Sequence, residues 1–155
     1  MAIVRMDHVV VVVRELDPAI AFFTELGMEL EGRMPGMKGD WIDRVNGIDG
    51  LEVEIAMMKT PDGVHKLELT KFHAPEVIDA GPNDRANTLG YRSVMFAVDD
   101  VDDTVERLRS YGGELVDQIV DFQGIYRLCY VRGPEGVIVA LAQELQPNPE
   151  LFAQD

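Results

Sequence analysis

Two stretches of the chain share one pattern of apolar and polar positions. Each begins with an apolar run, at residues 9–13 and 94–98. Such runs predict buried strands, because β-branched and aromatic side chains pack well on a pleated sheet. An acidic residue follows each run, Asp17 in the first stretch and Asp102 in the second, and is a good helix N-cap. Both stretches therefore predict a strand followed by a helix.

One gap-free shift of 85 positions superimposes the two stretches and places Gly27 on Gly112. Glycine tolerates the left-handed dihedral angles that commonly end a helix. The other positions that match in kind are Val13 on Val98, Glu15 on Asp100, Leu16 on Val101, Asp17 on Asp102, Ile20 on Val105, Phe23 on Leu108, Glu29 on Glu114 and Leu30 on Leu115. The chain is thus predicted to contain two copies of one structural unit.

A hairpin is predicted at the end of each copy. Residues 51–58 alternate apolar and acidic side chains at first and predict a strand, residues 61–63 form a Pro-Asp-Gly turn, and residues 64–72 return as a partner strand. The second copy repeats this order with strands at 124–132 and 137–143 around a turn at 133–136, after a strand near 115–120. Each unit is then βαβββ, and the fold class is α+β.

Glycine and proline mark the segments between these elements. Residues 32–50 are read as an irregular segment, either a rim over a pocket or a plain connector, that contains the single tryptophan, Trp41. The predicted organisation is a first unit at 1–73, a linker at 74–90, a second unit at 91–145 and a C-terminal tail at 146–155, which together form one domain.

Composition narrows the choice of partners. Fourteen Lys and Arg residues against 28 Asp and Glu residues give a net charge of −14, which repels nucleic acid phosphates and anionic lipid surfaces. We therefore expect neither nucleic acid nor membrane as a partner. The single cysteine, Cys129, is read as a small buried side chain. Without an internal disulfide, a signal peptide or an apolar stretch of ~20 residues, a cytoplasmic location is expected.

The motifs of this chain resemble those of the vicinal oxygen chelate superfamily, the group of glyoxalases, bleomycin-resistance proteins and extradiol dioxygenases. The residues that carry the resemblance are Asp7-His8 ahead of the valine run, Leu16-Asp17 after it, Pro61-Asp62-Gly63, Leu67-Glu68-Leu69, Phe96-Ala97-Val98-Asp99-Asp100-Val101 and Tyr130-Val131-Arg132-Gly133-Pro134-Glu135-Gly136. It implies two tandem βαβββ units that form a curved mixed sheet around a cup-shaped pocket. The fold does not specify a function.

The resemblance also implies a set of metal ligands, of which half is present. His8 and Glu68 match the ligand positions of the first unit, and both are also candidate catalytic residues. In the second unit, Ser93 stands opposite His8, and the last-strand position falls at Ala140 with a register uncertain by one residue. A divalent ion such as Zn, Ni, Mn or Fe and the absence of any metal are equally consistent with this set. Glu54 or Tyr126 are candidates to complete it.

Three readings of function follow. The first is a lyase or isomerase resembling lactoylglutathione lyase that acts on a small carbonyl or thiol-conjugated molecule with a metal, a dioxygenase being disfavoured by Ser93. The second is a metal-free protein that binds a small molecule or drug and resembles the bleomycin-resistance proteins, and the third is an enzyme that uses His8 and Glu68 for acid-base chemistry without a metal. Candidate pocket residues are Ser93, Trp41, Tyr126 and Arg92. The resemblance further implies a homodimer.

Overall fold

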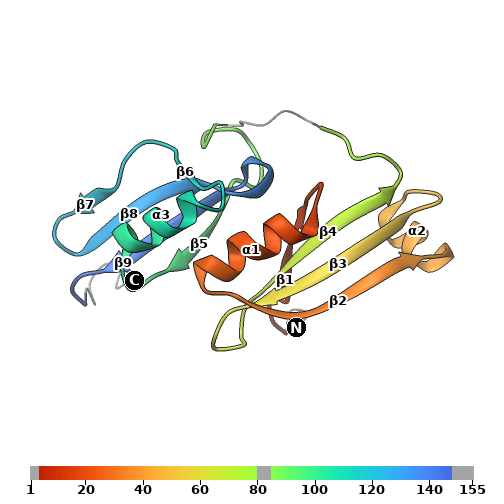
Figure 1. Ribbon diagram of the computed structural model, residues 1–155, viewed down its shortest axis with the longest axis horizontal. Helices are drawn as coiled ribbons and strands as arrows, with labels where there is room; N and C mark the ends of the chain where they lie inside the picture. Colours follow the sequence, from red (N-terminus) through yellow and green to blue (C-terminus); the bar gives the residue numbers. More distant parts are fainter. Residues whose placement is uncertain (1–3, 80–84, 148–155) are drawn as a thin grey trace. The chain divides into compact units, whose positions relative to one another are not determined.

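The computed structural model of the chain describes residues 4–79 and 85–147 and divides into two compact units, Met1–Pro82 and Asn83–Asp155. Parts of the predicted linker and of the predicted tail, residues 80–84 and 148–155, lie outside the described residues. The first unit contains β1 (His8–Val12), α1 (Leu16–Leu26), β2 (Glu29–Lys38), α2 (Asp40–Asn46), β3 (Glu52–Lys59) and β4 (Lys66–Ala74) (Figure 1). The second contains β5 (Ser93–Ala97), α3 (Val101–Arg109), β6 (Glu114–Leu115), β7 (Val120–Phe122), β8 (Tyr126–Arg132), a 3-10 turn (Pro134–Gly136) and β9 (Ile138–Glu144).

The sheet of the first unit has the strand order β1-β4-β3-β2, in which β1 runs parallel to β4 and the other pairs are antiparallel. Helix α1 covers one face of this sheet. Its side chains Phe22 and Phe23 are fully buried and meet edge to face, with ring centroids 5.2 Å apart. Leu69 of β4 and Met58 of β3 are also fully buried. The core of the unit therefore lies between α1 and the sheet.

The segment that the sequence indicated as irregular, residues 32–50, is mostly regular. Strand β2 runs through it to Lys38 with a register shift between Met34 and Met37, and α2 follows. This prediction was wrong because a β-bulge accommodates Pro35 and Gly36, and Gly36 takes a φ of 66°. Ile42 of α2 packs in a small second core with Leu51, Val53 and Ile55.

Both long helices begin earlier than their predicted caps. Helix α1 starts after Glu15, and α3 starts after Asp100, whose side chain accepts a hydrogen bond of 3.0 Å from the backbone N–H of Asp103. Asp17 and Asp102 lie within the first turns instead. Leu16 and Val101, the first residues of the two helices, are both almost inaccessible. The two corrected caps still differ by the repeat offset of 85.

The second unit repeats the arrangement of the first. Its sheet has the order β5-β9-β8-β6, with β5 parallel to β9 and β7 added at β8. The strand predicted near residues 115–120 is two short strands, β6 and β7. The prediction of an α+β fold with two βαβββ units is confirmed, and α2 is an addition within the first. Within the described residues, every helix is too short or too polar to cross a bilayer.

Cys129 of β8 is buried, as the sequence indicated. Burial, with a smaller contribution from Asp102, raises the pKa of its thiol to about 11. The thiol therefore stays protonated at neutral pH and is unsuited to act as a nucleophile.

Replacement of Leu69 by alanine tests the position of the core. Leu69 is fully buried under α1, so Leu69→Ala should lower the free energy of unfolding by about 2–5 kcal/mol. Val45→Ala is the control, because Val45 is 78% exposed, and it should change that free energy by less than about 0.5 kcal/mol. Urea denaturation measures both. Equal effects of the two substitutions would contradict this placement of the core.

Candidate functional site

The parallel pairing of β1 with β4 brings His8 and Glu68 together. His8 is opposite Lys66 and Val10 is opposite Glu68 in this register. Because side chains alternate along a strand, His8, Val10, Lys66 and Glu68 share one face of the sheet. Leu67 points to the other face and is buried there. The His8–Glu68 pair thus lies on the face of the sheet that α1 does not cover, which is called the open face below.

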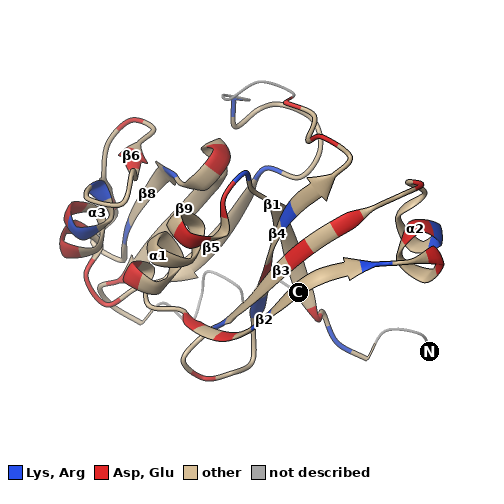
Figure 2. Cartoon of the chain, turned by 45° about the vertical axis from the view of Figure 1, so that its right-hand side comes forward, with Lys and Arg blue, Asp and Glu red and all other residues tan. Residues whose placement is uncertain are grey.

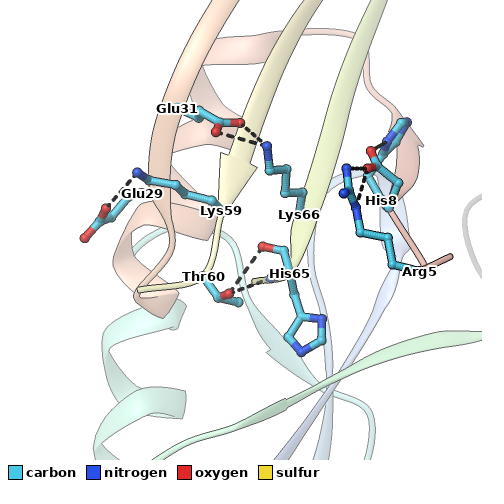
Figure 3. Close-up of polar contacts among 9 residues, drawn as sticks. Arg5, His8, Glu29, Glu31, Lys59, Thr60, His65 and Lys66 are labelled. Carbon is cyan, nitrogen blue, oxygen red and sulfur yellow. Dashed lines mark hydrogen bonds and ion pairs between the residues drawn. The ribbon is translucent and has the colours of Figure 1, made fainter. Parts of the chain in front are cut away.

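A line of polar contacts runs through this pair. Nε2 of His8 lies 3.1 Å from Oε2 of Glu68, and Nδ1 of His8 lies 2.8 Å from Oδ2 of Asp7. Asp7 also accepts a hydrogen bond of 2.7 Å from Arg5, and the Thr70 hydroxyl donates one of 2.8 Å to Oε1 of Glu68. Figure 3 shows Arg5 and His8 together at the start of β1. The His8 side chain is 31% exposed and that of Glu68 is 16% exposed.

Both ring nitrogens of His8 lie close to a carboxylate oxygen. A neutral ring has one N–H and one lone pair, whereas an ionised carboxylate only accepts hydrogen bonds, so only the doubly protonated ring can donate to both. The hydrogen bond from His8, followed by that from Arg5, lowers the pKa of Asp7 to about 2, so Asp7 is ionised at neutral pH. A pair of this kind can accept a proton with one member and donate with the other.

The donor set of the described residues falls short of a metal site. His8 and Glu68 are ligands of the right kind, but transition metals are usually held by three or four protein ligands. Within residues 4–79 and 85–147, no group of three His, Cys, Asp or Glu side chains is arranged to hold a metal ion. Glu54 does not complete the set, because its side chain points to the α1 face of the sheet.

The contacts of Glu54 establish this orientation. Its carboxylate accepts a hydrogen bond of 2.6 Å from Arg33, which also donates one of 2.8 Å to Asp17 of α1. The second oxygen of Glu54 lies 3.5 Å from Nε2 of His73. The hydrogen bond from Arg33 is the main cause of the lowered pKa of Glu54. This group ties α1 to the sheet and forms a second His–Glu pair on the opposite face from His8.

The second unit settles the register that the sequence left uncertain by one residue. Val10 is opposite Glu68 in the first sheet, and Met95, 85 positions after Val10, is opposite Ala140 in the second. Ala140 is therefore the structural counterpart of Glu68. Tyr130 pairs with Ala140 from its other side. Where the first unit has the Glu68 carboxylate, the second unit therefore has an apolar and aromatic surface.

The structure spreads the predicted pocket residues over several places. Trp41 lies on α2 and is 60% exposed. Helix α2 packs near Phe72 of β4, which is about 20 Å along that strand from the position opposite His8. Ser93 and Tyr126 are opposite Ile138 and Glu144 of β9, so about 20 Å of strand separates them. Arg92 is half-buried directly before β5.

Sequence reasoning missed two residues near Ala140 and one near His8. Tyr130 and Met95 flank Ala140 and are 39% and 60% exposed. Met95 is two residues from Ser93 and Tyr130 is four residues from Tyr126, and this even spacing on a strand, which places side chains on the same face, was the available signal. Lys66 is opposite His8 and two residues from Glu68, and the same alternation would have placed it on the open face.

Comparisons with known proteins agree with this fold. The family model described as Glyoxalase/Bleomycin resistance protein/Dioxygenase superfamily matches residues 5–141. The crystal structure of a glyoxalase family protein from Bacillus cereus is 48% identical, covers 94% of this chain and 99% of its own chain, and has a TM-score of 0.89. A trypanothione-dependent glyoxalase I from Leishmania major is 21% identical over 90% of this chain and 86% of its own, with a TM-score of 0.62. The last similarity shows the fold alone.

One curated relative has a stated activity. A 2-epi-5-epi-valiolone epimerase from an Actinomyces species is 33% identical over 112 residues, which are 71% of this chain and 60% of the epimerase. The chain thus aligns with little more than half of that relative.

The Asp7 carboxyl group provides a test of the contacts around His8. Its pKa of about 2 predicts that Asp7 becomes half protonated only near pH 2, and that the stability it contributes is lost as the pH falls from 3.8 through about 2. A ¹³C NMR titration of the Asp7 carboxyl measures the midpoint. His8→Gln should move it upward toward the ordinary value of 3.8, and Arg5→Gln should move it less. A midpoint near 3.8 in the unsubstituted protein would show that these contacts do not form.

Proposed function

The chain belongs to the Glyoxalase/Bleomycin resistance protein/Dioxygenase superfamily, and we propose that it is an isomerase or lyase that moves a proton next to the carbonyl group of a small molecule. The observation that carries this proposal is the distance of 3.1 Å between Nε2 of His8 and Oε2 of Glu68. The epimerase among the similar proteins supports the reaction class.

The arrangement of the pair supports a two-sided proton transfer. Glu68 takes the proton from the carbon beside the carbonyl group, and the protonated His8 donates to the carbonyl oxygen as negative charge develops there. Return of a proton to carbon from Glu68 and loss of one from the oxygen to His8 complete the cycle. Asp7 and Thr70 hold the outer edges of the pair, at 2.8 Å each, so both side chains are oriented before the substrate arrives.

No step of the proposed reaction uses a metal ion. The two donors of the first unit do not make a complete coordination sphere, and Glu54 is engaged with Arg33 on the opposite face. His8 and Glu68 are already in contact and satisfy each other. We therefore assign the acid-base chemistry to the two side chains themselves.

Hydrogen exchange measures the proposed reaction directly. The protein is incubated with small carbonyl compounds in D₂O, and ¹H NMR follows the loss of the proton beside the carbonyl group. Glu68→Gln and His8→Gln should each slow this exchange by about 10²–10⁴-fold, the usual contribution of a positioned acid or base. Exchange should persist after treatment with a chelator, and elemental mass spectrometry should find no stoichiometric metal.

The second His–Glu pair supplies the matched control. Glu54→Gln removes a carboxylate that also contacts a histidine, His73 at 3.5 Å, but from the α1 face of the same sheet. This variant should retain the exchange rate at temperatures where it remains folded. The proposal fails if Glu68→Gln and Glu54→Gln have equal effects. Loss of exchange on chelation would instead assign the chemistry to a metal.

A second candidate function is binding of a small apolar molecule without catalysis. The observation that favours it is the surface around Ala140. Ala140 stands where the first unit has Glu68, and its neighbours on the adjacent strands are Met95 and Tyr130. Both side chains are exposed, and exposed aromatic and thioether groups suit flat apolar ligands. This surface is formed by residues of the second unit, whereas the His8–Glu68 pair belongs to the first.

Fluorescence of the neutral probe N-phenyl-1-naphthylamine tests this second function. Tyr130→Ser should weaken binding of the probe about two- to twelvefold, because an aromatic contact contributes ~0.5–1.5 kcal/mol. Tyr111→Ser is the control, since Tyr111 is similarly exposed at 45% but follows α3. If the probe does not bind, or if both variants bind it equally well, the surface around Tyr130 is not a ligand site.

A further inference from the structure

Two lysines lie side by side next to the His8–Glu68 pair. Lys59 and Lys66 are direct partners across β3 and β4, at the end of the sheet where the hairpin turns. Their neighbours Met58 and Leu67 are buried under α1, so both lysines point to the open face. Like charges directly opposite each other on a sheet are unfavourable. This pair of lysines therefore calls for a physical explanation.

Each lysine is matched by a glutamate of β2. Nζ of Lys66 lies 3.0 Å and 2.9 Å from the two carboxylate oxygens of Glu31, and Nζ of Lys59 lies 3.7 Å from Oε2 of Glu29. Figure 3 shows Lys66 reaching from β4 toward Glu31, with Lys59 and Glu29 beside them. The two side chains of the Lys66–Glu31 pair are 32% and 39% exposed. Water and small ions can therefore reach this ion pair.

The strand positions of Lys66 and His8 are adjacent, and the Lys66 ammonium group is turned toward Glu31. Lys66 is the register partner of His8, and neighbouring strands are about 4.8 Å apart. Glu68 is two residues from Lys66 and points to the same face. A compound with an anionic group a few bonds from its carbonyl carbon can contact both places at once.

We propose that Lys66, supported by Lys59, binds a carboxylate or phosphate group of the substrate, and that Glu31 and Glu29 hold the two ammonium groups until this anion replaces them. The inference rests on the proposed function and names its substrate class, a small anionic carbonyl compound.

The charge of the protein determines where an anion can bind. Net charge is −14, and acidic and basic positions are interspersed on α2, α3 and the strands (Figure 2). Such a field repels anions, so a substrate anion is held only by direct contact with ammonium groups that Glu31 and Glu29 release. Partly exposed ion pairs contribute little net free energy, so exchanging Glu31 for a substrate anion costs little. Lys66 is then a binding and positioning residue rather than an acid or base.

Isothermal titration calorimetry at low ionic strength tests the proposal with three probes: orthophosphate, acetate and acetone. At least one anion should bind, and acetone should bind much more weakly because it lacks a charge. Lys66→Gln should weaken binding of the anion at least tenfold. Glu31→Gln should strengthen it, because the competing carboxylate is gone. Preference for orthophosphate or for acetate assigns the anionic group of the substrate.

Lys71→Gln is the matched control. Lys71 is on the same strand and pairs with Glu15 at 2.8 Å, but on the α1 face, so its loss should leave binding unchanged. Absence of binding by both anions overturns the proposal. So does equal binding by Lys66→Gln and the unsubstituted protein. Because binding is measured without turnover, anion binding at Lys66 together with unchanged hydrogen exchange in Glu68→Gln would reject the proposed reaction and retain the anion site.

Discussion

The parallel pairing of β1 with β4 is the constraint on which the candidate site depends. Two strands that run in the same direction cannot be joined by a tight turn, so the chain must pass through α1, β2, α2 and β3 before β4 returns beside β1. This long crossover places His8 within 3.1 Å of Glu68, sixty positions further along the chain. A shift of one residue in the register would turn Glu68 toward the core.

One face of the first sheet packs against α1, and the other carries the candidate site. On the α1 face, Arg33 bridges Asp17 of the helix and Glu54 of the sheet, and buried apolar side chains fill the remaining space. The open face carries the His8–Glu68 pair and, beside it, Lys66. Since the packing face holds the strands in register, the polar groups of the open face are oriented without being part of the core. The first unit therefore has one face packed against α1 and one face on which solvent can reach His8 and Glu68.

The second unit has the same strand pairing as the first but different side chains at the positions of the candidate site. Its β5 and β9 pair in the same parallel register, yet Ala140 stands where Glu68 stands in the first unit. Ser93 takes the place of His8. Strand pairing uses backbone groups and the buried face, so the residues of the exposed face are free to diverge between the two copies. The candidate acid-base pair is consequently confined to the first unit, and Tyr130 gives the second an aromatic surface.

The sequence by itself determined the repeat and the α+β class, because apolar periodicity and the offset of 85 are properties of local sequence. The resemblance of its motifs to a known superfamily singled out His8 and Glu68. Only the tertiary structure decided which groups meet. That Glu54 turns to Arg33, that Lys66 lies beside His8, and that Ala140 is the counterpart of Glu68 all depend on strand register and side-chain direction. These are set by packing between segments far apart in the chain, and periodicity within one segment does not encode them.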